Sequence, residues 1–256
     1  MYRTNKKWLK QFSLFFLEIV DSTNNEAKRI LAKENAPAQF VIHAKQQTSG
    51  RGRYGRSWDS LEGNLFFSIV IPRTGPLDLM TQLSFVAALA IEKTISNLFI
   101  KYKKPSTIEL KWPNDVLVGG KKISGILIET TGAHNSHIII GIGVNIENSP
   151  ILPEEYKATN LRAEAINFAN SDIVLNKIMS NFLENYYLWI AEGFIPIRQK
   201  WLKKAKAIGR IINVKTPQTR IVGKFIDIDF RGSVRLEISN GQICTVTPEE
   251  VFFLSA

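Results

Sequence analysis

Residues Leu65–Ile71 form an almost unbroken apolar run that ends at Pro72. A strand without a polar face must be covered on both sides, because either face would otherwise expose apolar side chains to water. The segment that follows, Leu77–Phe99, is apolar over most of its length and long enough to form a central helix. Together the two segments predict a sheet flanked by helices, which is an α/β architecture.

The first 206 residues continue this alternation of strands and helices. Further strands are expected at residues 15–19, 40–44, 107–112, 116–118, 123–129 and 138–144, and further helices at 21–33, 173–191 and 195–204. Thr23 and Glu26 stand at capping-box spacing, which predicts the start of the first helix. Residues 1–13 are polar and basic, and we expect a loosely held arm or an edge strand. The sequence thus predicts a large domain, residues 1–206, with a mixed β-sheet flanked by helices (α/β, or α+β).

After Lys206 the pattern changes to short strands, expected at residues 211–214, 219–227, 234–238, 242–246 and 251–254. Asn240-Gly241 is a strong signal for a tight hairpin turn between two of them. A run of short strands of this length predicts a small closed barrel of the SH3-like kind. We expect it to form a second domain, residues 210–256.

The composition is that of a soluble globular protein, with 45% hydrophobic and 22% charged residues. The single cysteine, Cys244, excludes an internal disulfide and favours a reducing compartment. The apolar run at residues 12–20 is too short for a signal peptide and no cleavage site follows it, so we expect a cytoplasmic protein without membrane spans. The net charge of +10 favours anionic partners, although a lysine-rich solvated surface explains it equally well.

The loop Gly50–Trp58, with the sequence GRGRYGRSW, cannot form a regular element and carries three arginines. Guanidinium groups bind phosphate and carboxylate bidentately, and Trp58 could cover an apolar ligand surface. The loop lacks the lysine ending of a Walker A loop. It also does not run from a strand into a helix, as a dinucleotide fingerprint does. Taken alone, it is more typical of a flexible basic surface loop.

Two further segments place polar groups at strand ends. In KWPND, residues 111–115, Pro113 breaks a strand, so Asn114 and Asp115 lie at a turn, where active-site groups often occur. In GKKISGILIE, residues 120–129, a lysine opens a buried strand and could reach a phosphate, and alternation favours one lysine of the pair pointing inward. The structural alternatives are an Asx turn and a pair of solvated hairpin lysines.

The last segment is the apolar strand at residues 139–146, which carries two glycines on one face. Gly141 and Gly143 leave room there for a ligand or another backbone. Asn145, at the end of the strand, has the paired donor and acceptor atoms needed to read an adenine edge. The alternative is a packing site under a helix.

In this order the segments resemble one family, the biotin–protein ligases, also called biotin–acetyl-CoA-carboxylase ligases. The pair of GRGRxGRxW and KWPND is highly specific, and Ser22-Thr23-Asn24 also falls where the family has this triplet. The resemblance is strong over residues 14–147 and weaker as far as the C-terminal strands. It implies a catalytic domain of the biotin/lipoate ligase type. It also implies an ATP-dependent ligase that forms biotinyl-5′-AMP and transfers biotin to a lysine of a biotin carboxyl carrier protein of a carboxylase.

The resemblance also implies the site residues. Those expected to bind biotin are Ser22, Thr23, Asn24, Gln47, Arg51, Gly52, Arg53, Trp58, Lys122, Gly125, Gly141 and Gly143. Those expected to bind the nucleotide are Arg51, Arg53, Arg56, Trp58, Asn114, Lys122 and Asn145. Those expected to act in catalysis are Lys122, Arg53 and Asp115. Ser22, Thr23 and Asn24 would meet the ureido end of biotin, and the Gly/Arg loop would fold over the adenylate.

Biotin and ATP are the implied substrates, with Mg²⁺ accompanying ATP near Asp115 and no prosthetic group. The three histidines, His43, His134 and His137, show no metal-ligand spacing. Longer bacterial members carry a winged-helix DNA-binding domain, for which the chain before Ser22 leaves no space. We therefore expect a ligase without specific DNA binding or membrane association, as a monomer or homodimer.

Two other functions remain open from the sequence. A lipoate–protein ligase or octanoyltransferase shares the catalytic fold, although the Arg-rich loop and KWPND fit the biotin branch better. A basic nucleic-acid-binding module built on the small barrel belongs to another class, and steep salt dependence of binding would reveal it.

Overall fold

The structure, a computed structural model, describes residues 7–131, 136–151, 157–215 and 220–247. Its centre is a seven-stranded sheet in the order β1-β2-β3-β7-β6-β5-β4. The strands are β1 (Ser13–Val20), β2 (Phe40–Gln47), β3 (Leu65–Pro72), β4 (Ile108–Lys111), β5 (Asp115–Val118), β6 (Lys121–Thr130) and β7 (His137–Val144). The β1–β2 pair is parallel and the other pairs are antiparallel, which confirms the predicted mixed sheet.

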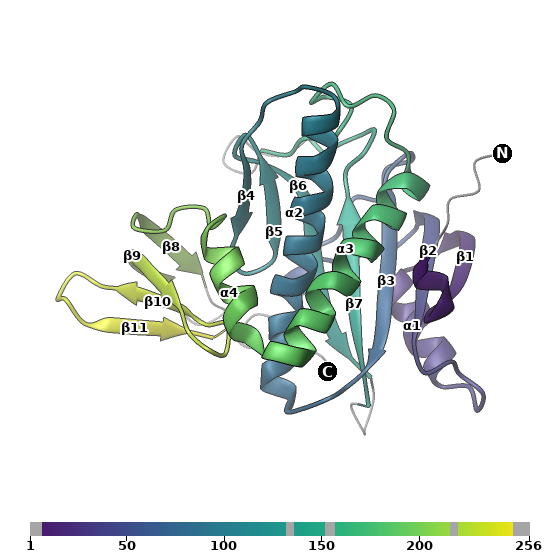
Figure 1. Cartoon of the computed structure of the whole chain (residues 1–256), viewed down its shortest axis with the longest axis horizontal. Coiled ribbons are helices and arrows are strands. Elements are labelled where there is room, and N and C mark those ends of the chain that lie inside the picture. Colours follow the sequence, from purple (N-terminus) through teal and green to yellow (C-terminus); the bar gives the residue numbers. More distant parts are fainter. Residues whose placement is uncertain (1–6, 132–135, 152–156, 216–219, 248–256) are drawn as a thin grey trace.

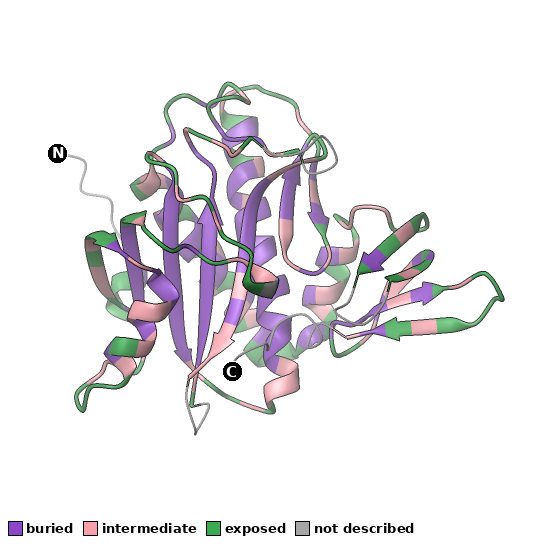
Figure 2. Ribbon diagram, turned by 180° about the vertical axis from the view of Figure 1, so that it is seen from behind, coloured by how far each residue is buried: buried purple, intermediate pink, exposed green. Residues whose placement is uncertain are grey.

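Helices cover both faces of this sheet (Figure 1). Helices α2 (Leu83–Lys101) and α3 (Ser171–Glu192) pack together over one face, and α1 (Thr23–Leu31) packs against β2, β3 and β7. In β3, Ile69 belongs to the large core beneath α2, whereas Val70 packs in a second core with Ala27 and Ile30 of α1. The apolar run of β3 is thus buried on both faces, as predicted, and Figure 2 shows the central strands as the buried heart of the fold.

The apolar segment predicted as one helix from residue 77 is divided in the structure. A 3-10 helix, η3 (Leu77–Gln82), precedes α2. The side-chain amide of Gln82 donates to the carbonyl oxygen of Phe230 at 2.8 Å, so this turn is tied to the C-terminal part of the chain. Residues 77–101 are apolar and long enough to cross a membrane by composition alone, but 78% of their most apolar window is buried inside the fold. Their apolarity therefore reflects a core position.

The expected loose arm is wrong for residues 7–12. These residues contain a short 3-10 helix, η1 (Lys7–Lys10), and bury Trp8 and Phe12 almost completely. The indole nitrogen of Trp8 donates to the side-chain oxygen of Asn176 in α3 at 3.0 Å. Two aromatic side chains thus anchor the segment before β1, because their burial outweighs its polar composition. Residues 1–6 lie outside the described residues.

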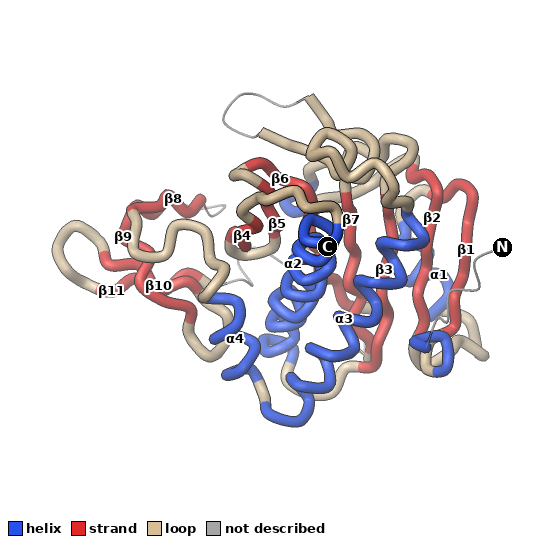
Figure 3. Tube along the Cα trace, turned by 45° about the horizontal axis from the view of Figure 1, so that its top comes forward, coloured by secondary structure: helices blue, strands red, loops and turns tan. Residues whose placement is uncertain are grey.

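Helix α4 (Phe194–Leu202) leads into a second sheet at the opposite end of the molecule from β1 (Figure 3). It comprises β8 (Ile211–Lys215), β9 (Arg220–Ile228), β10 (Val234–Glu237) and β11 (Ile243–Val246), antiparallel in the order β11-β10-β9-β8. The strand expected at 251–254 lies outside the described residues, so closure into a barrel stays a prediction. Phe225 and Leu236 of this sheet belong to the same core cluster as Phe85 of α2.

Candidate active site

A cavity of about 530 Å³ lies between the large sheet, the loop at residues 50–58 and the start of the C-terminal sheet. Every site residue predicted from the sequence lines it, except Asn145. Segments far apart in the chain meet here because β2 and β7 end at the edge of the sheet where β6 begins, and β5 opens directly from the KWPND turn. The cavity therefore joins a polar recess at the start of α1 with a strongly basic wall.

Asn145 does not reach the cavity. It is 2% exposed, and its side-chain amide nitrogen donates to the carbonyl oxygen of Thr159 at 3.0 Å. The end of β7 thus directs this side chain toward the segment at residues 157–161 and away from the cavity. Its Oδ1 atom is buried without a hydrogen-bond partner among the described residues. The adenine contact expected of Asn145 stays a prediction.

The start of α1 forms the polar recess of the cavity. Ser22 is the N-cap, in an extended conformation without a side-chain capping bond, so the predicted Thr23–Glu26 capping box is wrong. Gln47 Oε1, at the end of β2, instead accepts the backbone N–H of Thr23 at 2.9 Å and lies 3.2 Å from the Thr23 hydroxyl. Glu26 pairs with Arg29 at 2.6 Å. The Thr23 hydroxyl and the Glu26 carboxylate, which a capping box would use, therefore contact Gln47 and Arg29 instead.

A charged cluster on the outside of α1 holds its first turn in place. Arg29 donates to Asp21 and to Glu26, so one guanidinium bridges both carboxylates across the helix start. Hydrogen bonds from Arg29 hold the pKa of the Asp21 carboxyl well below its usual range. Both partners are partly exposed, which limits their effect on stability. These ion pairs join the residues on either side of Ser22, Thr23 and Asn24 and so help to hold those three residues in position.

The side chain of Asn24 lies against the sheet directly over Gly141, where any residue larger than glycine would clash with it. A Cβ atom on Gly141 would stand 2.4 Å from Asn24 Oδ1. The side chain of Asn24 runs between Ser68 of β3 and Glu129 of β6, with hydrogen bonds of 2.6 Å to each. Sequence reasoning missed Ser68, the single polar residue of the otherwise apolar strand β3, and Glu129, which follows the apolar run Ile126–Ile128 in β6.

The loop at residues 50–58 is a tight hairpin, so the prediction that it has no regular structure is wrong in detail. Gly52 N–H donates to the carbonyl oxygen of Arg56 at 2.7 Å, and Trp58 N–H donates to that of Gly50 at 2.9 Å. The tip is a 3-10 turn, η2 (Arg53–Gly55), in which Gly55 has φ +68°. Glycine permits this left-handed conformation without a Cβ clash. The turn carries its arginines over the mouth of the cavity.

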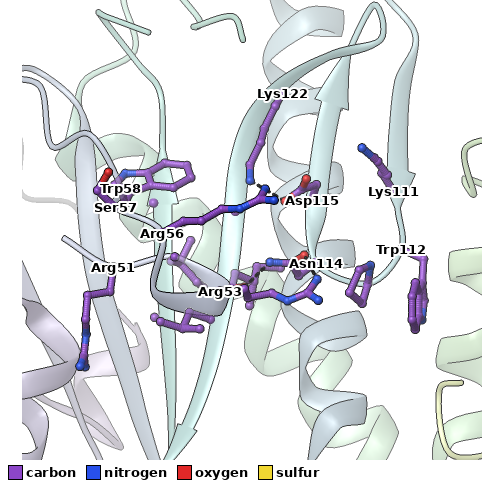
Figure 4. A pocket seen from close by; sticks show the side chains of 18 of the residues that line it. Arg51, Arg53, Arg56, Ser57, Trp58, Lys111, Trp112, Asn114, Asp115 and Lys122 are labelled. Carbon is purple, nitrogen blue, oxygen red and sulfur yellow. Dashed lines mark hydrogen bonds and ion pairs between the residues drawn. The ribbon is translucent and has the colours of Figure 1, made fainter. Parts of the chain in front are cut away.

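Two arginines of this loop, Arg53 and Arg56, extend toward the KWPND turn, and the third, Arg51, does not (Figure 4). Arg53 donates to the side-chain oxygen of Asn114 at 2.8 Å, which joins the loop to the KWPND turn. Arg51 points away from that turn and contacts Glu129 at 3.1 Å. Arg56 is exposed at the cavity edge. Arg51 therefore stands apart from the other two arginines, and Arg53 is held beside Asn114.

Trp58 fills the space that the glycines of the sheet leave open. A Cβ atom on Gly143 would lie 2.4 Å from its indole ring, and one on Gly125 would lie 2.8 Å away. The glycines were expected to admit a ligand, and in this structure they admit the indole. Its Nε1 atom is buried without a hydrogen-bond partner among the described residues. The aromatic ring thus covers β6 at Gly125 and β7 at Gly143.

Lys122 is the lysine of the pair that enters the cavity. Its ammonium lies 2.6 Å from Asp115 Oδ1 and 5.3 Å from the centre of the Trp58 ring. Lys121 points elsewhere and pairs with Glu164 at 3.0 Å. A register shift between β5 and β6 lies next to this pair. The expectation that one lysine turns inward is confirmed, and it is Lys122.

The C-terminal part of the chain supplies one end of the cavity, which the sequence did not reveal. The lining residues from this part are Lys206, Ala207, Ile212, Asn213, Val214, Lys215 and Phe225. Three lysines, Lys111, Lys206 and Lys215, thus lie around the end of the cavity that adjoins the C-terminal sheet. Such a wall can receive a group that carries several negative charges.

The described residues contain no group of three or more histidine, cysteine, aspartate or glutamate side chains that could hold a metal by themselves. Asp115 is the acidic residue in the described lining of the cavity. Magnesium is often held by one or two carboxylates together with substrate phosphates, so this arrangement fits an ion that arrives with a nucleotide. It does not fit a permanent protein-bound metal.

Comparison with known proteins gives matches over both parts of the chain. Residues 16–145 match the Biotin/lipoate A/B protein ligase family, and residues 207–253 match the Biotin protein ligase C terminal domain. The bifunctional ligase/repressor BirA of Bacillus subtilis is 34% identical over 234 residues, which are 89% of this chain and 70% of that protein. The biotin–[acetyl-CoA-carboxylase] ligase of Paracoccus denitrificans is 32% identical over 91% of this chain and 97% of its own length.

Among solved structures, the biotin protein ligase of Aquifex aeolicus in complex with biotin and ATP aligns with a TM-score of 0.76. It is 29% identical in sequence, and the alignment covers 93% of this chain and 97% of that one. The fold, the motif-bearing segments and the C-terminal sheet therefore agree with one set of relatives. The chain belongs to the Biotin/lipoate A/B protein ligase family and carries the C-terminal domain of the biotin protein ligases.

Proposed function

We propose that this chain is a biotin–protein ligase that activates biotin with ATP and transfers it to a lysine of a carrier protein. The observation that carries the proposal is the contact between the Gly/Arg loop and the KWPND turn. Arg53 Nη1 donates to Asn114 Oδ1 at 2.8 Å, so the two motifs that mark the biotin branch share one cavity. That cavity has a neutral polar recess at one side and lysines at the other.

The recess suits the ureido ring of biotin. A cyclic urea is compact and uncharged, and it needs a few aimed donors and acceptors. Ser22, Thr23, Asn24 and Gln47 line this part of the cavity and offer hydroxyl and amide groups. Trp58 provides the apolar cover for the ring and the acyl tail. We propose that these residues bind biotin and that Gly125, Gly141 and Gly143 let the ligand and its cover approach the sheet.

The first step joins two anions and therefore needs cations. A carboxylate oxygen of biotin attacks the α-phosphorus of ATP, an oxygen–phosphorus bond forms, and the bond from that phosphorus to the pyrophosphate oxygen breaks. We propose that Lys122, Arg51, Arg53 and Arg56 offset the repulsion and stabilise the charge on the phosphate oxygens, which such contacts do most effectively where water is excluded. Mg²⁺ bound with ATP would add positive charge at the phosphates, and Asp115 is the carboxylate suited to hold it.

The second step transfers the acyl group. The neutral amine of a carrier lysine attacks the carbonyl carbon of biotinyl-5′-AMP, and an amide forms as the nitrogen releases one proton. AMP leaves with the electron pair of the broken carbon–oxygen bond. No nucleophile of the enzyme is required. We propose that Asp115 orients the incoming amine and that the hairpin at residues 50–58 keeps water from the mixed anhydride. Asn114 would hold Arg53 in place during both steps.

We infer a biotin carboxyl carrier protein of a carboxylase as the partner, because the 32%-identical relative is a ligase of that kind. A lysine-rich end of the cavity would also favour approach of an acidic carrier. We further propose a cytoplasmic location. Lipoate–protein ligase activity is the alternative within the family, and the match of residues 207–253 to the biotin protein ligase domain argues against it.

The proposal is tested by ATP–pyrophosphate exchange on the purified chain. We expect exchange to depend on biotin and to be absent with lipoate or octanoate, because the recess offers aimed polar groups for a urea. Addition of a carrier domain should then give covalent biotinylation and release of AMP. Exchange supported by lipoate and not by biotin would assign the chain to the other branch of the family.

A further inference from the structure

We propose that Glu129 is a positioning residue that fixes the Thr23 hydroxyl as a hydrogen-bond acceptor for an N–H group of the bound urea. This inference rests on the proposed binding of biotin in the recess at α1. It concerns a residue near the carboxyl end of β6 that does not itself line the cavity. Its effect is transmitted through two hydrogen-bonded side chains, Asn24 and Ser68.

The Glu129 carboxylate collects three donors. Asn24 Nδ2 donates to it at 2.6 Å, Lys28 pairs with it at 2.9 Å, and Arg51 pairs with it at 3.1 Å. Its side chain is only 16% exposed. Lys28 and Arg51 both pair with it as cations, and the group that pairs with them is the charged carboxylate. An ionised carboxylate can only accept hydrogen bonds.

This restriction fixes the orientation of the Asn24 amide. Because Glu129 accepts only, Asn24 must present its NH₂ group to Glu129 and its Oδ1 to Ser68. Ser68 Oγ lies 2.6 Å from that oxygen, and an amide oxygen also accepts only. The single hydroxyl proton of Ser68 is therefore committed to Asn24. Ser68 is fully buried, so water does not offer it another partner.

The same reasoning fixes the proton of Thr23. Ser68 Oγ lies 2.7 Å from Thr23 Oγ1, and its own proton is already used. Thr23 must therefore donate to Ser68, and Gln47 Oε1 is left with the backbone N–H of Thr23 at 2.9 Å. The remaining lone pair of the Thr23 hydroxyl then serves as an acceptor, on a residue that lines the cavity. A urea ring supplies N–H donors, which match this acceptor.

The decisive variant is Glu129→Gln. A glutamine amide can donate as well as accept, so the Asn24 amide can turn over and the proton order from Asn24 to Thr23 can reverse. In the reversed order the Thr23 hydroxyl donates to Gln47 or into the cavity, where it meets the N–H of the ligand. We expect KM for biotin to rise about tenfold or more, which corresponds to loss of one hydrogen bond in a buried site. The recess binds substrate and transition state alike, so KM for biotin should change far more than kcat. KM for ATP reports separately on Arg51, which also loses its carboxylate partner.

Three further variants separate this role from a structural one. Glu184→Gln removes the carboxylate of an exposed ion pair with Lys93 at 2.8 Å, away from the cavity, and should leave all constants unchanged. Lys28→Met removes a partner of Glu129 without changing the proton order, so it should also leave KM for biotin unchanged. Glu129→Asp keeps an acceptor-only group and should recover part of the loss. Thermal melting of each variant checks that it is folded.

The inference is overturned by either of two results in biotin-dependent pyrophosphate exchange. One is a KM for biotin in folded Glu129→Gln that equals that of the unmodified protein. The other is an increase in Lys28→Met as large as that in Glu129→Gln, since this would assign the effect to the ion pair. If Glu129→Gln does not fold, the comparison of Glu129→Asp with Lys28→Met decides. Absence of biotin-dependent exchange in the unmodified protein contradicts the proposed function instead.

Discussion

Lys122 is the residue whose loss we expect to affect the chemistry most. Its ammonium lies in the cavity 2.6 Å from Asp115, whereas its neighbour Lys121 pairs with Glu164. Lys122→Ala should raise the barrier to ATP–pyrophosphate exchange by about 2–4 kcal/mol, because a preformed charge is lost where phosphate charge redistributes. Biotin affinity, measured by calorimetry, should change far less. Lys121→Ala is the matched control and should exchange at a near-normal rate. The opposite ranking of the two variants would identify Lys121 as the functional lysine.

At the level of elements, the hairpin at residues 50–58 is the part expected to respond to ligand. It is held by three backbone hydrogen bonds, the Arg53–Asn114 contact and the Arg51–Glu129 ion pair, and several of its side chains are exposed. Segments with few buried contacts open readily, so trypsin should cleave after its arginines in the free protein. Biotin with ATP should slow this cleavage about tenfold or more, in line with tight ligand binding to the closed form. The exposed turn at Lys103-Lys104 provides the internal control and should be cut equally fast in both conditions. Equal protection of the hairpin with and without ligands would contradict its role as a cover.

At the level of the whole molecule, the C-terminal sheet is both a part of the core and a wall of the cavity. Trp112 of the KWPND turn donates to the carbonyl oxygen of Gly232 at 2.9 Å, so removing this sheet would disturb the catalytic turn as well. Point changes are therefore the cleaner test. Lys206→Gln with Lys215→Gln should raise KM for ATP about tenfold, because two charge-assisted contacts to the polyphosphate are lost. Biotin affinity should not change. Lys224→Gln in β9, an exposed lysine outside the cavity lining, is the control, and an unchanged KM for ATP in the double variant would limit the sheet to a stabilising role.

Much of the fold could be predicted because it follows from local periodicity. The apolar run of β3 required cover on both faces, and the apolar segment of α2 required a core position; both expectations are confirmed. The motif-bearing segments were also found, since glycine, arginine and proline leave clear signals in a sequence. The capping box at Thr23 was wrong because the hydroxyl of this residue lies against Gln47 and Ser68, which are distant in the chain. Propensity rules describe only neighbours in sequence.

The sequence by itself thus determined which segments become strands and helices, and which residue types are available for binding an anion and a small polar ring. Only the tertiary structure decided where those side chains point. Asn145 turned to Thr159, Arg51 turned to Glu129, and Asn24 came to lie between Ser68 and Glu129. The physical reason is that these contacts depend on the order of strands in the sheet, in which β3, β7 and β6 are neighbours and α1 packs against β2, β3 and β7. Burial periodicity sets the face of each strand, but the pairing of strands sets which residues meet across that face.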